Sequence, residues 1–303
     1  MADMREHDVL SWDGTKIRTW RTAGEGPPVL MCPGVGSGPE SWPSLTGRGG
    51  LVSWYMRGTM GSGRPVDERN ITLDDHVSDA LAVLDDAGVE RCVVIGWSMG
   101  VTIAAELALR HPDRVAGLLL VAGAPGDSFE GMLPVLPANV RRTVGLAATK
   151  LLRQAGPLLD QVLHRVPVTD LTTFLLRHSG VIKPSSDPKA VSAAVARFLR
   201  HDWRWYFTLA LALGETPRQD LGPVVCPVTL LAGRDDVLAT TESMSAPVGA
   251  LPQARLRVLP CSHYLPLEAP EVVGEELDLM LDRVRAVDFA TSEVFTPGSR
   301  SRT

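Results

Sequence analysis

Residues 96–100, Gly-Trp-Ser-Met-Gly, place Ser98 where a serine could act as a nucleophile. They directly follow the apolar run 92–95 and open the helical pattern 101–110, so a strand, a tight turn and a helix are predicted. A serine on such a turn has a strained backbone that projects Oγ above the sheet, and side chains two positions to either side would collide with neighbouring backbone. Glycine at both positions therefore favours a nucleophile over a structural turn.

With this segment the chain resembles the α/β-hydrolase superfamily, in its cap-bearing branch of esterases, C–C hydrolases, perhydrolases and related enzymes. The resemblance spans residues 7–287. It implies an α/β-hydrolase fold with a mostly parallel central sheet, an N-terminal antiparallel hairpin and an inserted helical cap. It also implies a catalytic triad in the chain order nucleophile, acid, histidine.

His263 is the histidine after Ser98 that has the context of a catalytic base. Residues 261–270 follow the last predicted strand and resemble the histidine loop of the family, although Ser262 stands where glycine is often found. Surface or packing roles suffice for five others, namely His76, His111, His164, His178 and His201. Of these, His201 lies in an aromatic cluster of the predicted cap and is the best candidate for contact with substrate.

The orienting acid is predicted at the end of the apolar run 230–232, where Gly233 precedes a pair of aspartates. In similar enzymes the acid commonly stands three positions after this glycine, which selects Asp236. Asp235 is the alternative, and would otherwise cap the loop or face solvent. A buried carboxylate that accepts from the imidazole Nδ1 holds the required tautomer and stabilises the imidazolium formed as Ser98 loses its proton.

A tetrahedral intermediate also needs two backbone donors for its oxyanion. The N–H of Met99 is one by position. Residues 32–36, Cys-Pro-Gly-Val-Gly, resemble the H-G-x-G segment of the family, which makes the N–H of Val35 the second, although Pro33 replaces the histidine that orders this loop. The predicted substrate contacts are Trp97, Gly34 and Tyr264.

A further resemblance lies in residues 53–65, which look like the strand-to-loop motif that the family builds around an Arg-Gly pair, here Arg57 and Gly58. Tyr55 occupies a place often held by aspartate, and the loop from Arg57 to Gly63 is one residue longer than usual. These departures support the fold and leave details of the pocket open.

The elements that must position these residues follow a consistent rhythm. Residues 7–12 and 16–21 predict a hairpin around Asp13 and Gly14. Short apolar runs alternating with helical patterns then predict a parallel sheet buried on both faces. The runs are 28–32, 51–56, 91–96, 115–122, 228–232 and 256–259, and the clearest helices are 73–87, with Thr72 as N-cap and Gly88 as stop, and 270–287.

Residues 126–222 break this rhythm with leucine-rich helical patterns, punctuated by proline and glycine, and no convincing strand. We expect a helical cap at 126–222 inserted into a core of residues 1–125 and 223–290, followed by a flexible tail at 291–303.

Composition limits the remaining possibilities. The chain has 303 residues, 45% hydrophobic residues, a formal charge of −5 and a pI near 5.8, so it lacks the basic surplus that nucleic-acid binding requires. The four cysteines are far apart, which predicts reduced, mostly buried thiols and no metal site. The start of the chain has no secretory signal pattern and no run suits a membrane span, so a cytoplasmic location is expected.

The chemistry predicted from these residues is acyl transfer from a small hydrophobic ester or thioester to water, as in a carboxylesterase, with no metal or organic cofactor. A serine nucleophile argues against haloalkane dehalogenases and epoxide hydrolases, which need aspartate at this turn. C–C bond hydrolysis, peracid formation and cofactor-free oxygen chemistry remain alternatives on the same fold. So does a non-catalytic protein that binds a small ligand under its cap. The substrate and the oligomeric state are open.

Overall fold

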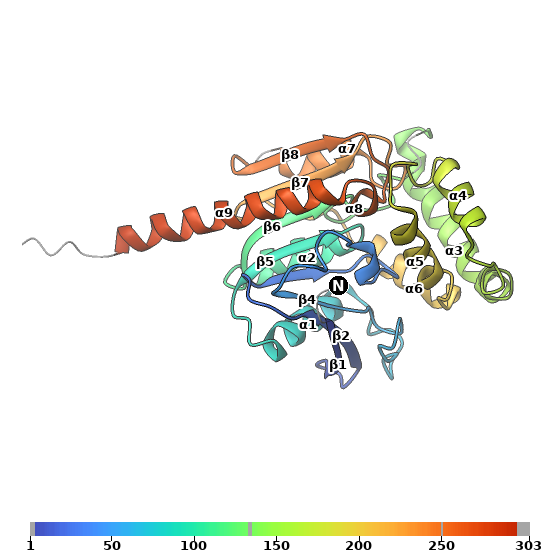
Figure 1. The fold of residues 1–303 in the computed structure, drawn as a ribbon, viewed down its shortest axis with the longest axis horizontal. Helices are drawn as coiled ribbons and strands as arrows, with labels where there is room; N and C mark the ends of the chain where they lie inside the picture. Colours follow the sequence, from blue (N-terminus) through green and yellow to red (C-terminus); the bar gives the residue numbers. More distant parts are fainter. Residues whose placement is uncertain (1–3, 133–134, 250, 296–303) are drawn as a thin grey trace, which may run out of the picture.

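One sheet organises the part of the chain that the computed structural model describes, residues 4–132, 135–249 and 251–295. Its eight strands lie in the order β1-β2-β4-β3-β5-β6-β7-β8 (Figure 1). Strands from β4 to β8 pair in parallel, and β2 pairs antiparallel with β1 and β4. The bounds are β1 Met4–Leu10, β2 Lys16–Thr22, β3 Val29–Cys32, β4 Leu51–Trp54, β5 Cys92–Trp97, β6 Val115–Val121, β7 Val228–Gly233 and β8 Ala254–Leu259. The predicted α/β architecture, including its N-terminal hairpin, is confirmed.

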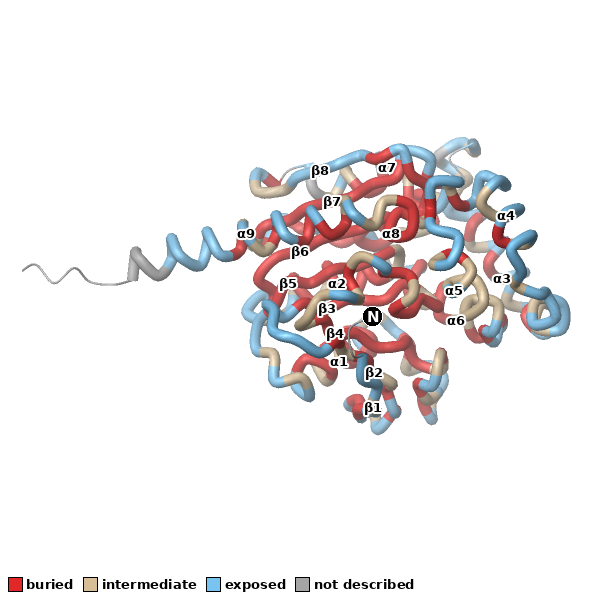
Figure 2. The backbone as a smooth tube through the Cα atoms, viewed as in Figure 1, coloured by how far each residue is buried: buried red, intermediate tan, exposed pale blue. Residues whose placement is uncertain are grey.

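The central strands are buried on both faces because helices cover both (Figure 2). In β3, Leu30 and Cys32 pack into the core on one face, and Val29 and Met31 pack into the core on the other. This explains the uninterrupted apolar runs of the sequence. The helices are α1 (Leu73–Asp86), α2 (Gly100–Arg110) and α7 (Thr241–Ser245) on the first face, and α8 (Leu265–Glu268) and α9 (Pro270–Phe295) on the second.

Helix α1 begins and ends where the sequence predicts. The hydroxyl of Thr72 accepts from the N–H of Asp75, and the Asp75 carboxylate accepts from the N–H of Thr72, which together form a capping box. Gly88, just beyond the helix, has a φ of +66°, a conformation that glycine adopts without steric cost.

The last helix is longer than predicted. We expected it to end near Val287 and residues 291–303 to form a tail, but α9 continues to Phe295, while residues 296–303 lie outside the described residues. The sequence has no proline or glycine between Gly274 and Pro297, so nothing in the backbone stops the helix earlier.

Between β6 and β7 the described residues form helices and no strand, as predicted. We call α3 to α6 the helical insertion; its helices are α3 (Ala138–Leu163), α4 (Asp170–His178), α5 (Pro188–Phe198) and α6 (Trp203–Gly214). Helix α3 runs through Gly156 and Pro157, where the sequence suggested a break. A β carbon at Gly156 would lie 2.6 Å from the Cα of Arg204, so this glycine allows α3 and α6 to pack closely. No helix within the described ranges combines the length and apolarity needed to cross a membrane.

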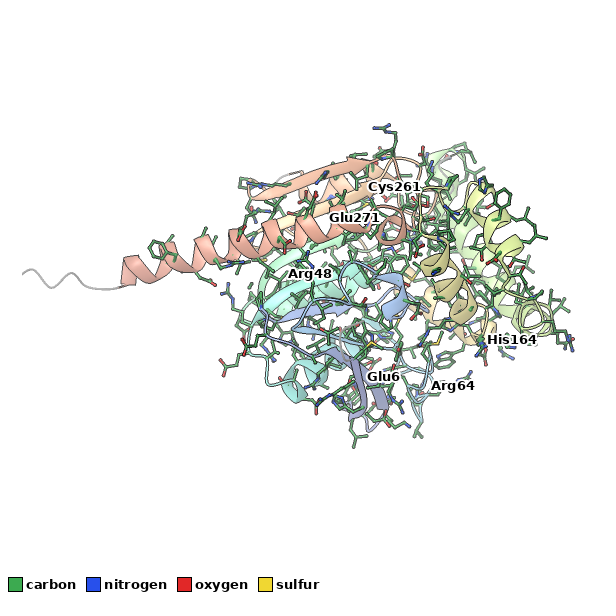
Figure 3. All side chains as sticks on the ribbon, viewed as in Figure 1. Glu6, Arg48, Arg64, His164, Cys261 and Glu271 are labelled. Atoms are coloured by element: carbon green, nitrogen blue, oxygen red, sulfur yellow. The ribbon has the colours of Figure 1, made fainter. Side chains whose placement is uncertain are left out.

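Polar contacts join the helical insertion to the core. Arg64, labelled in Figure 3, pairs with Asp202 and lies over the ring of Trp205, with 4.5 Å between its guanidinium carbon and the ring centroid. The indole Nε1 of Trp205 donates to the carbonyl of Arg57 at 2.7 Å. The insertion is therefore fixed against the loop that follows β4.

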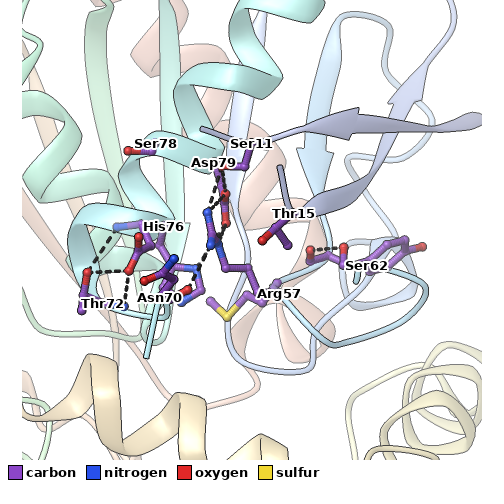
Figure 4. A network of polar contacts seen from close by, with 12 residues as sticks. Ser11, Thr15, Arg57, Ser62, Asn70, Thr72, His76, Ser78 and Asp79 are labelled. Carbon is purple, nitrogen blue, oxygen red and sulfur yellow. Dashed lines mark hydrogen bonds and ion pairs between the residues drawn. The ribbon is translucent and has the colours of Figure 1, made fainter. Parts of the chain in front are cut away.

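Arg57, the arginine of the predicted Arg-Gly pair, is a fully buried ion-pair centre (Figure 4). Its Nε and Nη2 donate to the two carboxylate oxygens of Asp79 at 2.8 and 2.7 Å. Nη1 donates to Asp13 at 2.7 Å and Nη2 to the hydroxyl of Ser11 at 2.9 Å. These bonds tie the N-terminal hairpin and α1 to the loop after β4.

We expect Arg57→Met to lower the free energy of unfolding by about 3–5 kcal/mol, because it leaves the buried Asp79 carboxylate unpaired. The matched control is Arg69→Met, which removes an exposed pair with Asp67 and should cost less than about 1 kcal/mol. Urea unfolding followed by tryptophan fluorescence measures both. Equal losses in the two variants would contradict this account of the network.

Candidate active site

Ser98 stands on the sharp turn that the sequence predicts, between the end of β5 and the start of α2. Its φ is +55°, in the left-handed region that non-glycine residues rarely adopt. The flanking glycines leave room for the turn: a β carbon at Gly96 would lie 2.6 Å from the carbonyl oxygen of Gly100, and one at Gly100 would overlap the carbonyl oxygen of Cys32. The predicted reason for glycine at both positions is therefore confirmed.

Three predicted site residues, Ser98, His263 and Asp236, lie in one hydrogen-bonded chain. His263 Nε2 is 2.9 Å from the Oγ of Ser98, and His263 Nδ1 is 2.9 Å from Oδ2 of Asp236. The other carboxylate oxygen of Asp236 accepts from the backbone N–H of Leu238 and of Ala239, at 2.8 and 2.9 Å. An ionised carboxylate only accepts, so Nδ1 carries the proton and Nε2 is free to accept from the serine. This arrangement can withdraw a proton from Ser98.

Asp235, the alternative acid, is directed elsewhere. Its Oδ2 accepts from the ammonium of Lys183 at 2.6 Å, and its side chain is 49% exposed, whereas that of Asp236 is fully buried. The structure therefore brings Asp236, and not Asp235, to His263.

Hydrogen bonds to neighbouring segments hold the loop that carries His263. Trp97 donates its indole N–H to the carbonyl of His263 at 3.1 Å. The buried carboxylate of Glu268 accepts from the N–H of Ser262 at 2.7 Å and from the N–H of Lys183, in the segment between α4 and α5, at 2.8 Å. Ser262 donates its hydroxyl to Glu268 and lies 2.9 Å from the carbonyl of Val181.

Glu268 and Lys183 are the residues of this region that sequence reasoning missed. A carboxylate in the apolar segment 265–269 was the available signal, because a carboxylate there must find partners on burial. The partner Lys183 lies 85 residues away and follows no local pattern.

The predicted oxyanion donors face the same site. Val35 and Met99 both line the cavity that contains Ser98, and within the described residues neither backbone N–H donates a hydrogen bond to the protein. A β carbon at Gly34 would lie 3.3 Å from that of Ser98, so the loop after β3 lies directly against the serine. The arrangement is compatible with the predicted donor role of these two backbone groups, which stays a prediction.

The cavity above Ser98 has a volume of about 520 Å³ and is mostly apolar. The predicted substrate contacts Trp97, Gly34 and Tyr264 all line it. Burial raises the pKa of the Tyr264 phenol, which therefore stays neutral. All four helices of the insertion contribute to the wall, through residues that include Leu152, Leu176, Phe198 and Phe207.

Metal-ligating groups and thiols have no assigned part in this arrangement. Among the described residues, no cluster of three or more histidine, cysteine, aspartate or glutamate side chains could hold a metal ion. The cysteines are free: Cys32, Cys92 and Cys261 are buried and Cys226 is half-buried. Burial raises the pKa of the Cys261 thiol to about 11, so it stays protonated at neutral pH.

This fold and this strand-turn-helix site define a hydrolase of the α/β type. The chain belongs to the alpha/beta hydrolase fold family, whose sequence profile matches residues 27–270.

Relatives within this family differ in chemistry. The 2-hydroxymuconate semialdehyde hydrolase of Pseudomonas putida is 28% identical over 258 residues, which are 82% of this chain and 84% of that protein. A protein of Azorhizobium caulinodans provisionally named carbamate hydrolase RutD is 39% identical over 111 residues, a match that covers 35% of this chain and only 41% of that relative. The solved esterase EaEST of Exiguobacterium antarcticum covers 93% of this chain and 100% of its own, with a TM-score of 0.71 and 18% identity, and shows the fold alone.

The close packing under Ser98 gives a stability prediction. We expect Gly100→Ala to lower the free energy of unfolding by about 1–3 kcal/mol, because its β carbon has no room against the Cys32 carbonyl. In the control Gly47→Ala the new β carbon meets nothing within 4 Å, so the change should be within about 0.5 kcal/mol. Thermal and urea unfolding measure both variants. An unchanged free energy of unfolding for Gly100→Ala would show that the turn can shift to accommodate a β carbon.

Proposed function

We propose that this protein is a serine hydrolase that cleaves a carboxylic ester of a small hydrophobic substrate through an acyl-enzyme. The observation that carries the proposal is the chain of contacts from Ser98 through His263 to Asp236, at 2.9 Å in each step. The Ser98 end of this chain of contacts lies in the wall of an apolar cavity that is large enough for a small substrate.

The proposed cycle has two halves. The Oγ of Ser98 attacks the ester carbonyl carbon while its proton moves to Nε2 of His263, and the N–H groups of Val35 and Met99 stabilise the oxyanion. The intermediate collapses to an acyl-serine as the ester C–O bond breaks, and His263 gives its proton to the leaving alkoxide. Water then attacks the acyl-serine with His263 as base, which releases the acid and restores Ser98.

The cavity favours an uncharged substrate. None of the described residues that line it is lysine or arginine, so a carboxylate on the substrate would lack a cationic partner there. Glu40 is the lining carboxylate, and its Oε1 lies 3.1 Å from Nε of Arg197, outside the lining. Because all four helices of the insertion contribute residues to the cavity wall, we propose that residues 126–222 act as a cap that selects the substrate.

A second candidate is C–C bond hydrolysis, favoured by the long match to the 2-hydroxymuconate semialdehyde hydrolase. The name of that compound denotes a carboxylate, which the cavity of this chain is poorly built to hold. Assays with this semialdehyde and with neutral p-nitrophenyl esters, side by side, distinguish the two activities.

Replacing the nucleophile tests the proposal directly. We expect Ser98→Ala to lower ester turnover at least about a thousandfold, because no other group can form the acyl-enzyme, while the unfolding temperature stays within a few degrees. Release of p-nitrophenol from acetate, butyrate and octanoate esters measures turnover. Mass spectrometry should find a fluorophosphonate probe on Ser98 in the wild type. A wild type that neither turns over esters nor takes up the probe would favour a ligand-binding protein instead.

The two aspartates give a matched pair. Asp236→Asn should lower kcat about a hundred- to ten-thousandfold, because an amide oxygen cannot stabilise the imidazolium as a carboxylate does and the favoured tautomer is lost. Asp235→Asn, which loses only an exposed pair with Lys183, should keep kcat within about threefold. Steady-state kinetics on one ester measures both, and the reverse order would refute the assignment of the acid.

A further inference from the structure

The loop that supplies Val35 is a tight turn. The N–H and the hydroxyl of Ser37 both donate to the carbonyl of Gly34, at 3.1 and 2.9 Å, and Gly36 has a φ of +74°. These two bonds close the turn. They hold the Gly34 carbonyl, which lies in the same planar peptide group as the N–H of Val35, so the closure of the turn decides where that N–H points.

The turn has few groups of its own to hold that orientation. Residues 33–38 read Pro-Gly-Val-Gly-Ser-Gly, so Ser37 is the one residue among them with a polar side chain, and its hydroxyl is already used to close the turn. A segment this rich in glycine loses much conformational entropy when it becomes ordered. A contact from outside the turn offsets this cost and so favours the ordered conformation.

The helical insertion provides such an anchor. His201, between α5 and α6, places Nε2 3.0 Å from the carbonyl oxygen of Gly36, across 165 residues of sequence. A carbonyl only accepts, so the ring donates from Nε2. The residue is 4% exposed, and burial lowers the pKa of the ring, which keeps it neutral at pH 7.

The residues around this contact are closely packed. A β carbon at Gly36 would lie 2.5 Å from His201 Nε2 and 3.0 Å from the ring of Tyr206. The imidazole packs against Phe198 and Tyr206, with ring centroids 5.6 Å away in each case. His201 itself does not line the cavity over Ser98, so a packing role, which the sequence already allowed for it, accounts for its ring better than contact with substrate.

We propose that His201 is a positioning residue that holds the Gly36 carbonyl and thereby aims the N–H of Val35 at the oxyanion. This inference rests on the proposed function. The predicted signature is a loss in kcat without a change in KM, because the contact acts on the oxyanion of the transition state and His201 itself does not line the cavity.

The test compares His201→Gln with His201→Asn. The amide nitrogen of glutamine can take the place of imidazole Nε2, whereas asparagine is one methylene shorter and cannot reach the Gly36 carbonyl. Both replace the buried ring with an amide, and they differ by the one methylene that decides whether the amide reaches Gly36. We expect kcat on p-nitrophenyl butyrate within about threefold of wild type for glutamine, and about ten- to a hundredfold lower for asparagine, with KM unchanged in both. His178→Asn, on exposed α4, is the control and should leave kcat unchanged.

Hydrogen–deuterium exchange separates this inference from the proposed function, because it needs no substrate. Amides of residues 34–38, 40 and 41 should exchange faster in the free asparagine variant than in the wild type or the glutamine variant. Should the wild type turn over no ester, the proposed function fails, and the exchange data still test the loop contact. The inference is overturned if the asparagine variant keeps both wild-type kcat and wild-type exchange. It is also overturned if KM rises alone, or if glutamine loses as much as asparagine.

Discussion

The backbone of Ser98, held at a φ of +55°, is the constraint on which the site depends. A left-handed serine costs on the order of 1–3 kcal/mol, so its surroundings must hold it. The N–H of Ser98 donates to the carbonyl of Val121 on β6 at 3.0 Å, and a β carbon at Gly123 would overlap the carbonyl oxygen of Ser98. Strand β5 and helix α2 thus meet at a turn with no room to relax, and Oγ is exposed to the cavity as a result.

The parallel sheet brings the partners of Ser98 to the same edge. Asp236 follows β7 and His263 follows β8, and the carboxyl ends of parallel strands lie together. The loops are then fixed by bonds that are themselves buried: two backbone donors hold Asp236, while Trp97 and Glu268 hold the loop of His263. Strand order therefore sets the approximate positions of Ser98, Asp236 and His263, and hydrogen bonds within the loops set their exact distances.

The helical insertion does more than cover the cavity. One side of it reaches the histidine loop, where Val181 and Lys183 contact Ser262 and Glu268. The other side reaches the loop after β3, where His201 meets Gly36. The helical insertion, which we propose selects the substrate, thus also contacts both loops beside Ser98.

The sequence by itself determined the sheet, the turn at Ser98 and the loop of His263, because buried strands, flanking glycines and helix caps are short-range patterns. Through the resemblance it also favoured Asp236 over its neighbour Asp235 as the acid. Only the tertiary structure placed Asp236 against His263 and Asp235 against Lys183, carried α9 on to Phe295, and brought His201 to Gly36 and Lys183 to Glu268. These contacts join residues far apart in the chain, and their partners are chosen by packing between layers, which leaves no periodic trace in the sequence.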